Sequence, residues 1–141
     1  MAYATAQDMI DRFEETVLKQ VTDPEAQEIQ GPALTRSLED ASDEIDGYLQ
    51  SRYTLPLDPA PRILRILSSN IAMYRLLVLR PLGDIEDARK RYEDAIKFLT
   101  RVAAGEVSLG LSEDAQVAAE SGGPQVAGPA RTFSRDTLKG F

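Results

Sequence analysis

The residues best suited to chemistry are four carboxylates that lie close together, at Asp40, Asp43, Glu44 and Asp46. Grouped carboxylates can bind a divalent cation or share the acid and base roles of glycoside hydrolysis. Their spacing does not match a calcium loop, which places ligands at alternate positions and ends in a distant glutamate. No aromatic or polar platform for a sugar accompanies them. We therefore interpret the cluster as the solvated face of a helix and predict no metal site and no catalytic pair.

Histidine and cysteine are both absent from the chain of 141 residues. Their absence excludes a cysteine nucleophile, a histidine base, a zinc finger and a disulfide. No glycine-rich run between an expected strand and helix would hold phosphate. We therefore expect neither an enzyme nor a bound cofactor.

The basic run at residues 89–91, with Lys97 and Arg101 beyond it, is the candidate site for nucleic acid. Neighbouring acidic residues neutralise its field, namely Glu86, Asp87, Glu93 and Asp94. No aromatic platform for stacking on bases interleaves with the basic side chains. We interpret the run as salt-bridged surface and expect no sequence-specific reading of DNA, while weak backbone contact by a ring of copies stays open.

Net charge is unevenly distributed along the chain. The total of −7 argues against broad attraction to nucleic acid or anionic lipid. Residues 1–58 carry 13 acidic and 4 basic side chains, residues 59–105 carry 5 and 9, and residues 106–141 carry 5 and 3. We hypothesise that the acidic part of one copy meets the basic part of the next, so that added salt weakens association.

The length, with 43% hydrophobic and 28% charged residues, is typical of one globular domain. The longest apolar stretch, residues 71–79, contains Arg75 and is too short to span a membrane. Residues 1–8 have neither the basic region nor the apolar run of a signal peptide, and we expect none.

Two short helices are expected first. Thr5 and Asp8 have the spacing of a capping box that opens a helix ending near Phe13. A second helical piece ends before Pro24, because proline disfavours helix at the preceding residue. Its apolar residues are Val17, Leu18 and Val21.

Three long amphipathic helices should follow, over about residues 33–52, 60–80 and 85–104. The first buries Leu34, Leu38, Ala41, Ile45, Tyr48 and Leu49. The second carries Pro59 and Pro61 in its first turn and aligns Ile63, Leu67, Ile71, Tyr74 and Val78. Around residues 71–79 the second helix is apolar on nearly all sides, so neighbours must cover it there.

The third long helix should begin after an Asp84 cap and end at Gly105. Its buried stripe is Ile85, Ala88, Tyr92, Ala95, Ile96, Leu99 and Val102. On its outer face, Glu86 with Lys90 and Glu93 with Lys97 are spaced for ion pairs. In the first long helix, Gly47 lies opposite the apolar stripe, and we favour a tolerated surface glycine over a close approach there.

The pattern changes after Gly105, and residues 107–111 are briefly strand-like. Residues 121–130 (SGGPQVAGPA) have no periodicity, and they indicate a flexible arm over 111–141 behind a helical domain over 1–110. We therefore predict an all-α fold, a small bundle of about three long helices plus short N-terminal helices. Apolar residues return at the far end of the arm, at Phe133, Leu138 and Phe141. Apolar residues beyond such a linker indicate either a docking peptide or a tail without function, and we give the two interpretations equal weight.

Three stretches resemble a known family, namely residues 1–13 (MAYATAQDMIDRF), 40–57 (DASDEIDGYLQSRYTLPL) and 92–110 (YEDAIKFLTRVAAGEVSLG). They resemble the gene-product-thirty-six proteins of Mu-like phages and prophages, which are similar to the helical head-completion, or head–tail adaptor, proteins of tailed phages. The resemblance implies a structural virion protein that forms a ring, commonly of twelve copies. The ring would lie in the virion neck between the portal protein and a tail-side neck protein and leave a channel for DNA. It would assemble in the host cytoplasm, and the family has no catalytic residues to carry over.

Six apolar residues are the predicted partner-binding positions. Met73, Leu76 and Leu79 would supply the apolar part of the contact between copies, and Phe133, Leu138 and Phe141 would anchor the arm on a neighbouring subunit or the portal. By resemblance, the isolated chain is expected to stay monomeric until the portal templates the ring. The competing class is a small helical scaffold or regulatory interaction protein, monomeric or dimeric, with a disposable tail. The mass of the native particle discriminates the two.

Overall fold

The computed structural model describes residues 2–23, 25 and 27–111. These residues form five helices and no strand, so the all-α prediction is confirmed. The helices are α1 (Ala6–Arg12), α2 (Glu15–Thr22), α3 (Gly31–Leu49), α4 (Arg62–Leu79) and α5 (Glu86–Ala103). The predicted arm, with Phe133, Leu138 and Phe141, lies outside the described residues.

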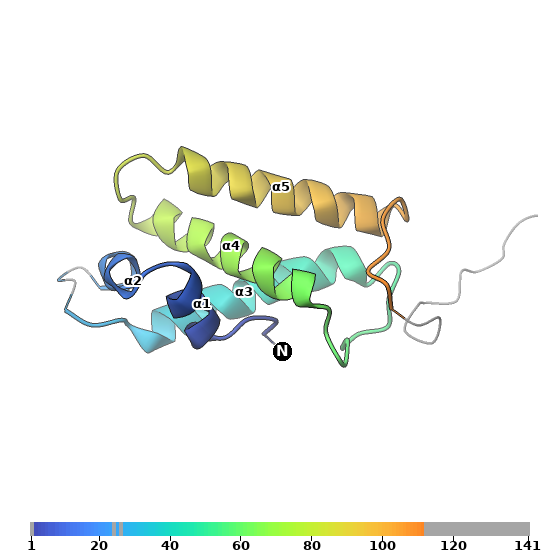
Figure 1. Ribbon diagram of the computed structural model, residues 1–141, viewed down its shortest axis with the longest axis horizontal. Coiled ribbons are helices and arrows are strands. Elements are labelled where there is room, and N and C mark those ends of the chain that lie inside the picture. Colours follow the sequence, from blue (N-terminus) through green and yellow to red (C-terminus); the bar gives the residue numbers. More distant parts are fainter. Residues whose placement is uncertain (1, 24, 26, 112–141) are drawn as a thin grey trace, which may run out of the picture.

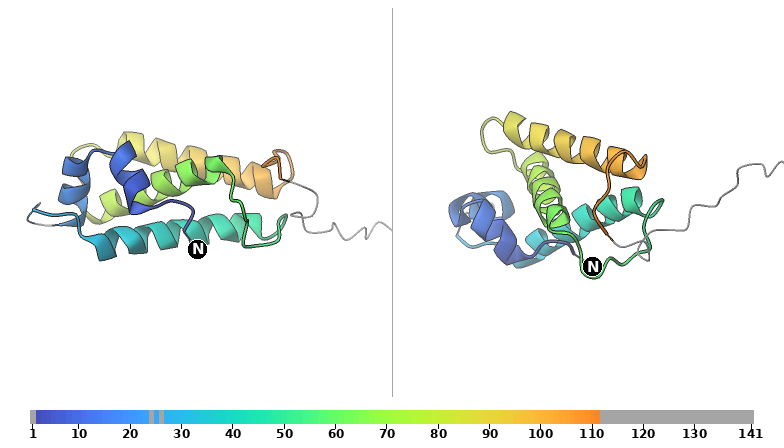
Figure 2. Two further views of the ribbon diagram at one scale, coloured as in Figure 1. Left: turned by 60° about the horizontal axis from the view of Figure 1, so that its bottom comes forward. Right: turned by 45° about the vertical axis from the view of Figure 1, so that its right-hand side comes forward.

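The three long helices form a bundle in which α4 runs antiparallel to α3 and α5 (Figure 1). The short helix α1 packs against α3 and α4, and α2 packs against α4 and α1. This leaves α4 between the short helices and α5 (Figure 2). Because α4 has neighbours on several sides, it is the central element of the core.

The buried residues of α4 are not simply the single line that the sequence analysis predicted, because several neighbouring helices cover this helix. Leu64 is fully buried, whereas Ile63 and Tyr74 are half-buried and the side chain of Val78 is 53% exposed. The sequence predicted that neighbours cover residues 71–79 on nearly all sides. Residues 71–77 are buried or half-buried, whereas the last two residues of the helix, Val78 and Leu79, are exposed. The buried apolar side chains of α4 are Leu64, Leu67, Ile71, Ala72, Met73, Leu76 and Leu77.

The ends of the early helices follow local chemistry. The capping box of α1 is present, with the Asp8 N–H donating to the Thr5 hydroxyl (3.2 Å) and the Thr5 N–H donating to the Asp8 carboxylate (2.8 Å). Helix α3 begins two residues earlier than expected, with Pro32 in its first turn, where a missing N–H costs nothing. The prediction that two prolines occupy the first turn of α4 is wrong, since Pro61 is the N-cap and Pro59 lies in the connector. A proline disfavours helix at the residue before it, which delays the start of α4.

Helix α5 buries the predicted stripe, with Ala95, Leu99 and Val102 in the core. The Asp84 carboxylate accepts from the Glu86 N–H (2.9 Å), although the residue that caps the helix by position is Ile85. The chain leaves α5 through Gly105, whose φ is 80°. This positive φ favours glycine there, and a Cβ at Gly105 would also displace the guanidinium at the end of the flexible Arg52 side chain.

Candidate partner-binding surface

The four clustered carboxylates of α3 divide into two exposed and two with partners. Asp40 and Asp43 are exposed, as a solvated helix face requires. Asp46 is half-buried and accepts a hydrogen bond from the Tyr3 hydroxyl, which ties the N-terminal segment to α3. Burial of the Tyr3 ring, and secondarily this hydrogen bond, raise the pKa of Tyr3 above its ordinary value. Among the described residues, no group of three or more potential ligands is placed to hold a metal ion.

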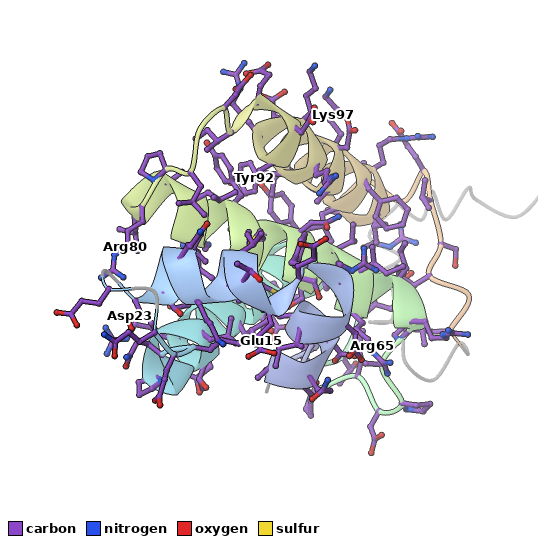
Figure 3. The ribbon with its side chains drawn as sticks, turned by 60° about the vertical axis from the view of Figure 1, so that its left-hand side comes forward. Glu15, Asp23, Arg65, Arg80, Tyr92 and Lys97 are labelled. Atoms are coloured by element: carbon purple, nitrogen blue, oxygen red, sulfur yellow. The ribbon has the colours of Figure 1, made fainter. Side chains whose placement is uncertain are left out.

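Glu44 connects the three long helices. Its carboxylate accepts from the Arg75 guanidinium on α4 (2.6 Å) and from the Tyr92 hydroxyl on α5 (2.8 Å). Figure 3 shows Tyr92 on the side of α5 that faces the rest of the bundle. Burial first, and then the hydrogen bond to the Glu44 carboxylate, raise the pKa of Tyr92 to about 12. The Tyr92 ring stacks on Tyr74 of α4, with ring centroids 4.6 Å apart and planes 21° from parallel.

This contact forms one wall of a surface hollow of about 470 Å³, which we call the α4 groove. The groove is lined by Asp40, Tyr74, Arg75, Val78, Leu79 and Tyr92. The side chains of Val78 and Leu79 are 53% and 79% exposed. They are two of the three large apolar side chains that lie exposed in the described part of the chain. Two consecutive exposed aliphatic residues beside a hollow with aromatic walls are typical of a surface that a partner covers.

The partner-binding residues predicted on α4 divide between core and surface. Met73 and Leu76 are only 5% and 3% exposed, so the prediction that they supply an apolar surface is wrong. They point into the core because α4 has neighbours on several sides, which the apolar pattern of α4 alone does not reveal. Leu79 lies on the surface, as a contact residue must. Val78 and Tyr92 also line the groove, although their spacing suggested only buried stripes.

Two ion pairs join the acidic and basic parts of the chain within one protomer. Helix α4 carries three arginines and no acidic residue, and a fourth arginine, Arg80, is its C-cap. Besides Arg75 with Glu44, Arg65 lies 3.7 Å from the Asp8 carboxylate of α1. Hydrogen bonds, chiefly from the Glu25 N–H, lower the pKa of Asp23, and the charge of Arg80 adds to this effect. Figure 3 labels Asp23, Arg65 and Arg80 on this side of the bundle.

The outer face of α5 is a salt-bridged surface, as predicted. Arg89 pairs with Glu86 (2.9 Å) and approaches Glu93 (3.8 Å), and Lys97 approaches Asp94 (3.7 Å). The two predicted lysine pairs are replaced by these alternatives, because residues three and four apart compete on one helix face. Residues 84–105 carry five acidic and five basic side chains, so this segment has no net charge.

Gly47 has open space beside it, since a Cβ there would meet nothing within 4 Å. This confirms a tolerated surface glycine within the protomer. No helix in the described ranges is long and apolar enough to cross a membrane.

The fold and the groove together define a small helical protein with a surface suited to binding a partner. A sequence model of the family described as "Bacteriophage Mu, Gp36" matches residues 3–128, and the chain therefore belongs to this family. It is 39% identical over 140 residues to the "Mu-like prophage FluMu protein gp36" of Haemophilus influenzae, covering 99% of this chain and 97% of that protein. It is 32% identical over 146 residues to "Gene product J" of Escherichia phage Mu, covering 100% of this chain and 99% of that protein.

Proposed function

We propose that this protein is a structural component of the virion, a head–tail connector that joins the portal protein to a tail-side neck protein. The observation that carries the proposal is family membership along almost the whole chain, since the matches extend well beyond the three stretches that suggested it. In this role the protein acts by fitting against copies of itself and against neck proteins. It catalyses no reaction and uses no cofactor.

The described surface supports a role in assembly. A ring needs heterologous contacts, in which one face of each copy meets a different face of the next. The α4 groove supplies an apolar face, and Leu79 projects from its edge. Because two of the three arginines of α4 pair within the protomer, we assign the main part of the contact to apolar burial and a smaller part to charge. DNA passes through the channel of the ring without being read.

The test is removal of the gene from an inducible prophage that carries it, followed by electron microscopy of the induced lysate. A connector predicts DNA-filled heads and finished tails that stay separate, and whole virions when the gene is supplied in trans. Complementation by Leu79→Asp should fail, whereas complementation by Ile66→Asp, a control at another exposed position of α4, should succeed. Normal virions from the deleted prophage would overturn the proposal.

A further inference from the structure

The α4 groove leaves Val78 and Leu79 exposed on an isolated chain. We propose that before assembly this groove is the docking site of residues 131–141 of the same chain. This occupancy would keep the apolar face covered until a neck protein displaces the segment. Its role in assembly rests on the proposed function, whereas the docking is a property of the chain alone.

The chemistry of the segment matches that of the groove. Residues 131–141 (RTFSRDTLKGF) combine three large apolar side chains with three cations and one carboxylate. The stacked rings of Tyr74 and Tyr92 present faces on which Phe rings and Arg guanidinium groups pack favourably. Asp40 lines the groove and forms no ion pair with any residue in the described part of the chain. A cation of the docked segment would supply that partner.

The length of the intervening chain suits docking within one molecule. From Tyr92 to the end of α5 at Ala103 is eleven residues, a rise of about 17 Å. Residues 112–130 supply nineteen residues, and an unfolded chain of that length has a root-mean-square span of about 24 Å. The linker starts beyond the segment in which the Leu109 N–H donates to the Tyr53 hydroxyl (3.1 Å), so it must reach back past the end of α5 to the groove. Nineteen residues reach about 60 Å when extended, more than the length of α5, and a short tether of this kind can give an effective concentration in the millimolar range. A second copy reaches that concentration only in very concentrated protein, so the segment of the same chain is the favoured occupant.

The test uses paramagnetic relaxation in the full-length protein. The chain has no cysteine, so a nitroxide attached through Gly140→Cys marks one position. We expect the amide signals of Asp40, Val78 and Tyr92 to lose at least about half their intensity, because an occupied groove brings the nitroxide near them. A mixed sample, with the nitroxide on one chain and the isotope on another, should show no such loss.

Leu79→Asp in the labelled chain should restore the signals, because a carboxylate would enter the apolar part of the groove. Leu79 is 79% exposed, so the variant should fold, which circular dichroism checks. Ile66→Asp on the same helix is the matched control and should leave the loss unchanged. Full signal intensity at the groove, a loss confined to another surface, or a loss in the mixed sample would each overturn the proposal. None of these results would alter the outcome of the gene deletion.

Discussion

Glu44 is the polar side chain that joins all three long helices, and its removal should destabilise the bundle. The substitution Glu44→Ala deletes the acceptor for both the Arg75 guanidinium and the Tyr92 hydroxyl, and so separates α3 from α4 and α5 at one point. The carboxylate side chain is only 18% exposed, so water replaces it incompletely as a partner for the Tyr92 hydroxyl.

The expected magnitude follows from the two contacts. A hydrogen bond to a charged acceptor contributes about 1.5–3 kcal/mol. The ion pair adds up to about 1 kcal/mol, because the Arg75 side chain is 40% exposed and water screens it. Alanine favours helix slightly more than glutamate, which offsets a few tenths of a kcal/mol. The free energy of unfolding should therefore fall by about 2–3 kcal/mol, which lowers the Tm of a domain of this size by roughly 10 °C.

Urea denaturation and thermal melts followed by circular dichroism measure this loss. Asp43→Ala, one residue earlier on an exposed position of α3, is the matched control and should change stability by less than about 0.5 kcal/mol. The double variant with Tyr92→Phe should lose less than the sum of the two single changes, because they share one hydrogen bond. Equal stability of Glu44→Ala and Asp43→Ala would refute the structural role of Glu44.

Three further predictions concern the core, the glycines and pH. Leu64→Ala, at a fully buried position of α4, should cost about 2–5 kcal/mol in urea denaturation, and a cost below 1 kcal/mol would contradict its burial. Gly47→Ala should stabilise the protein by about 0.5–1 kcal/mol because its site is open and helical, whereas Gly105→Ala should destabilise it by at least about 1 kcal/mol; thermal melts giving both changes the same sign would contradict this contrast. Because folding raises the pKa of Tyr92 to about 12, its contribution to stability is complete below the unfolded pKa of about 10 and is lost as pH rises through 12. Urea midpoints measured across this range should decline less steeply in Tyr92→Phe, and an unchanged slope would contradict the shift.

The helices themselves were predictable because three of them follow local rules. Capping chemistry at Thr5 and Asp8 identifies the start of α1, and a glycine with positive φ ends α5. The stripes of α3 and α5 are one-sided, so the period of their apolar residues identifies the buried face directly. The apolar period does not identify the buried face of α4, because this helix has neighbours on several sides. A helix that is apolar on nearly all sides gives no sign of which of its residues remain exposed to solvent.

The candidate site was less predictable than the fold. The partners of Glu44 lie 31 and 48 residues away along the chain, so no local pattern distinguishes this carboxylate from the exposed ones beside it. Leu79 was found by its apolar character, but the same reasoning selected Met73 and Leu76, which the bundle buries. The sequence shows the excess of arginine in α4. It does not show that two of these arginines pair with acidic residues of the same protomer, because that pairing depends on how the helices pack.

The proposed place of this protein in the virion is tested most directly by a cryo-electron microscopy map of the neck of a phage that encodes it. The account predicts a ring of copies between portal and tail, into which the bundle of α3, α4 and α5 fits with the α4 groove at a contact between proteins. A neck whose density is fully explained by other proteins, with none left for this bundle, would contradict it.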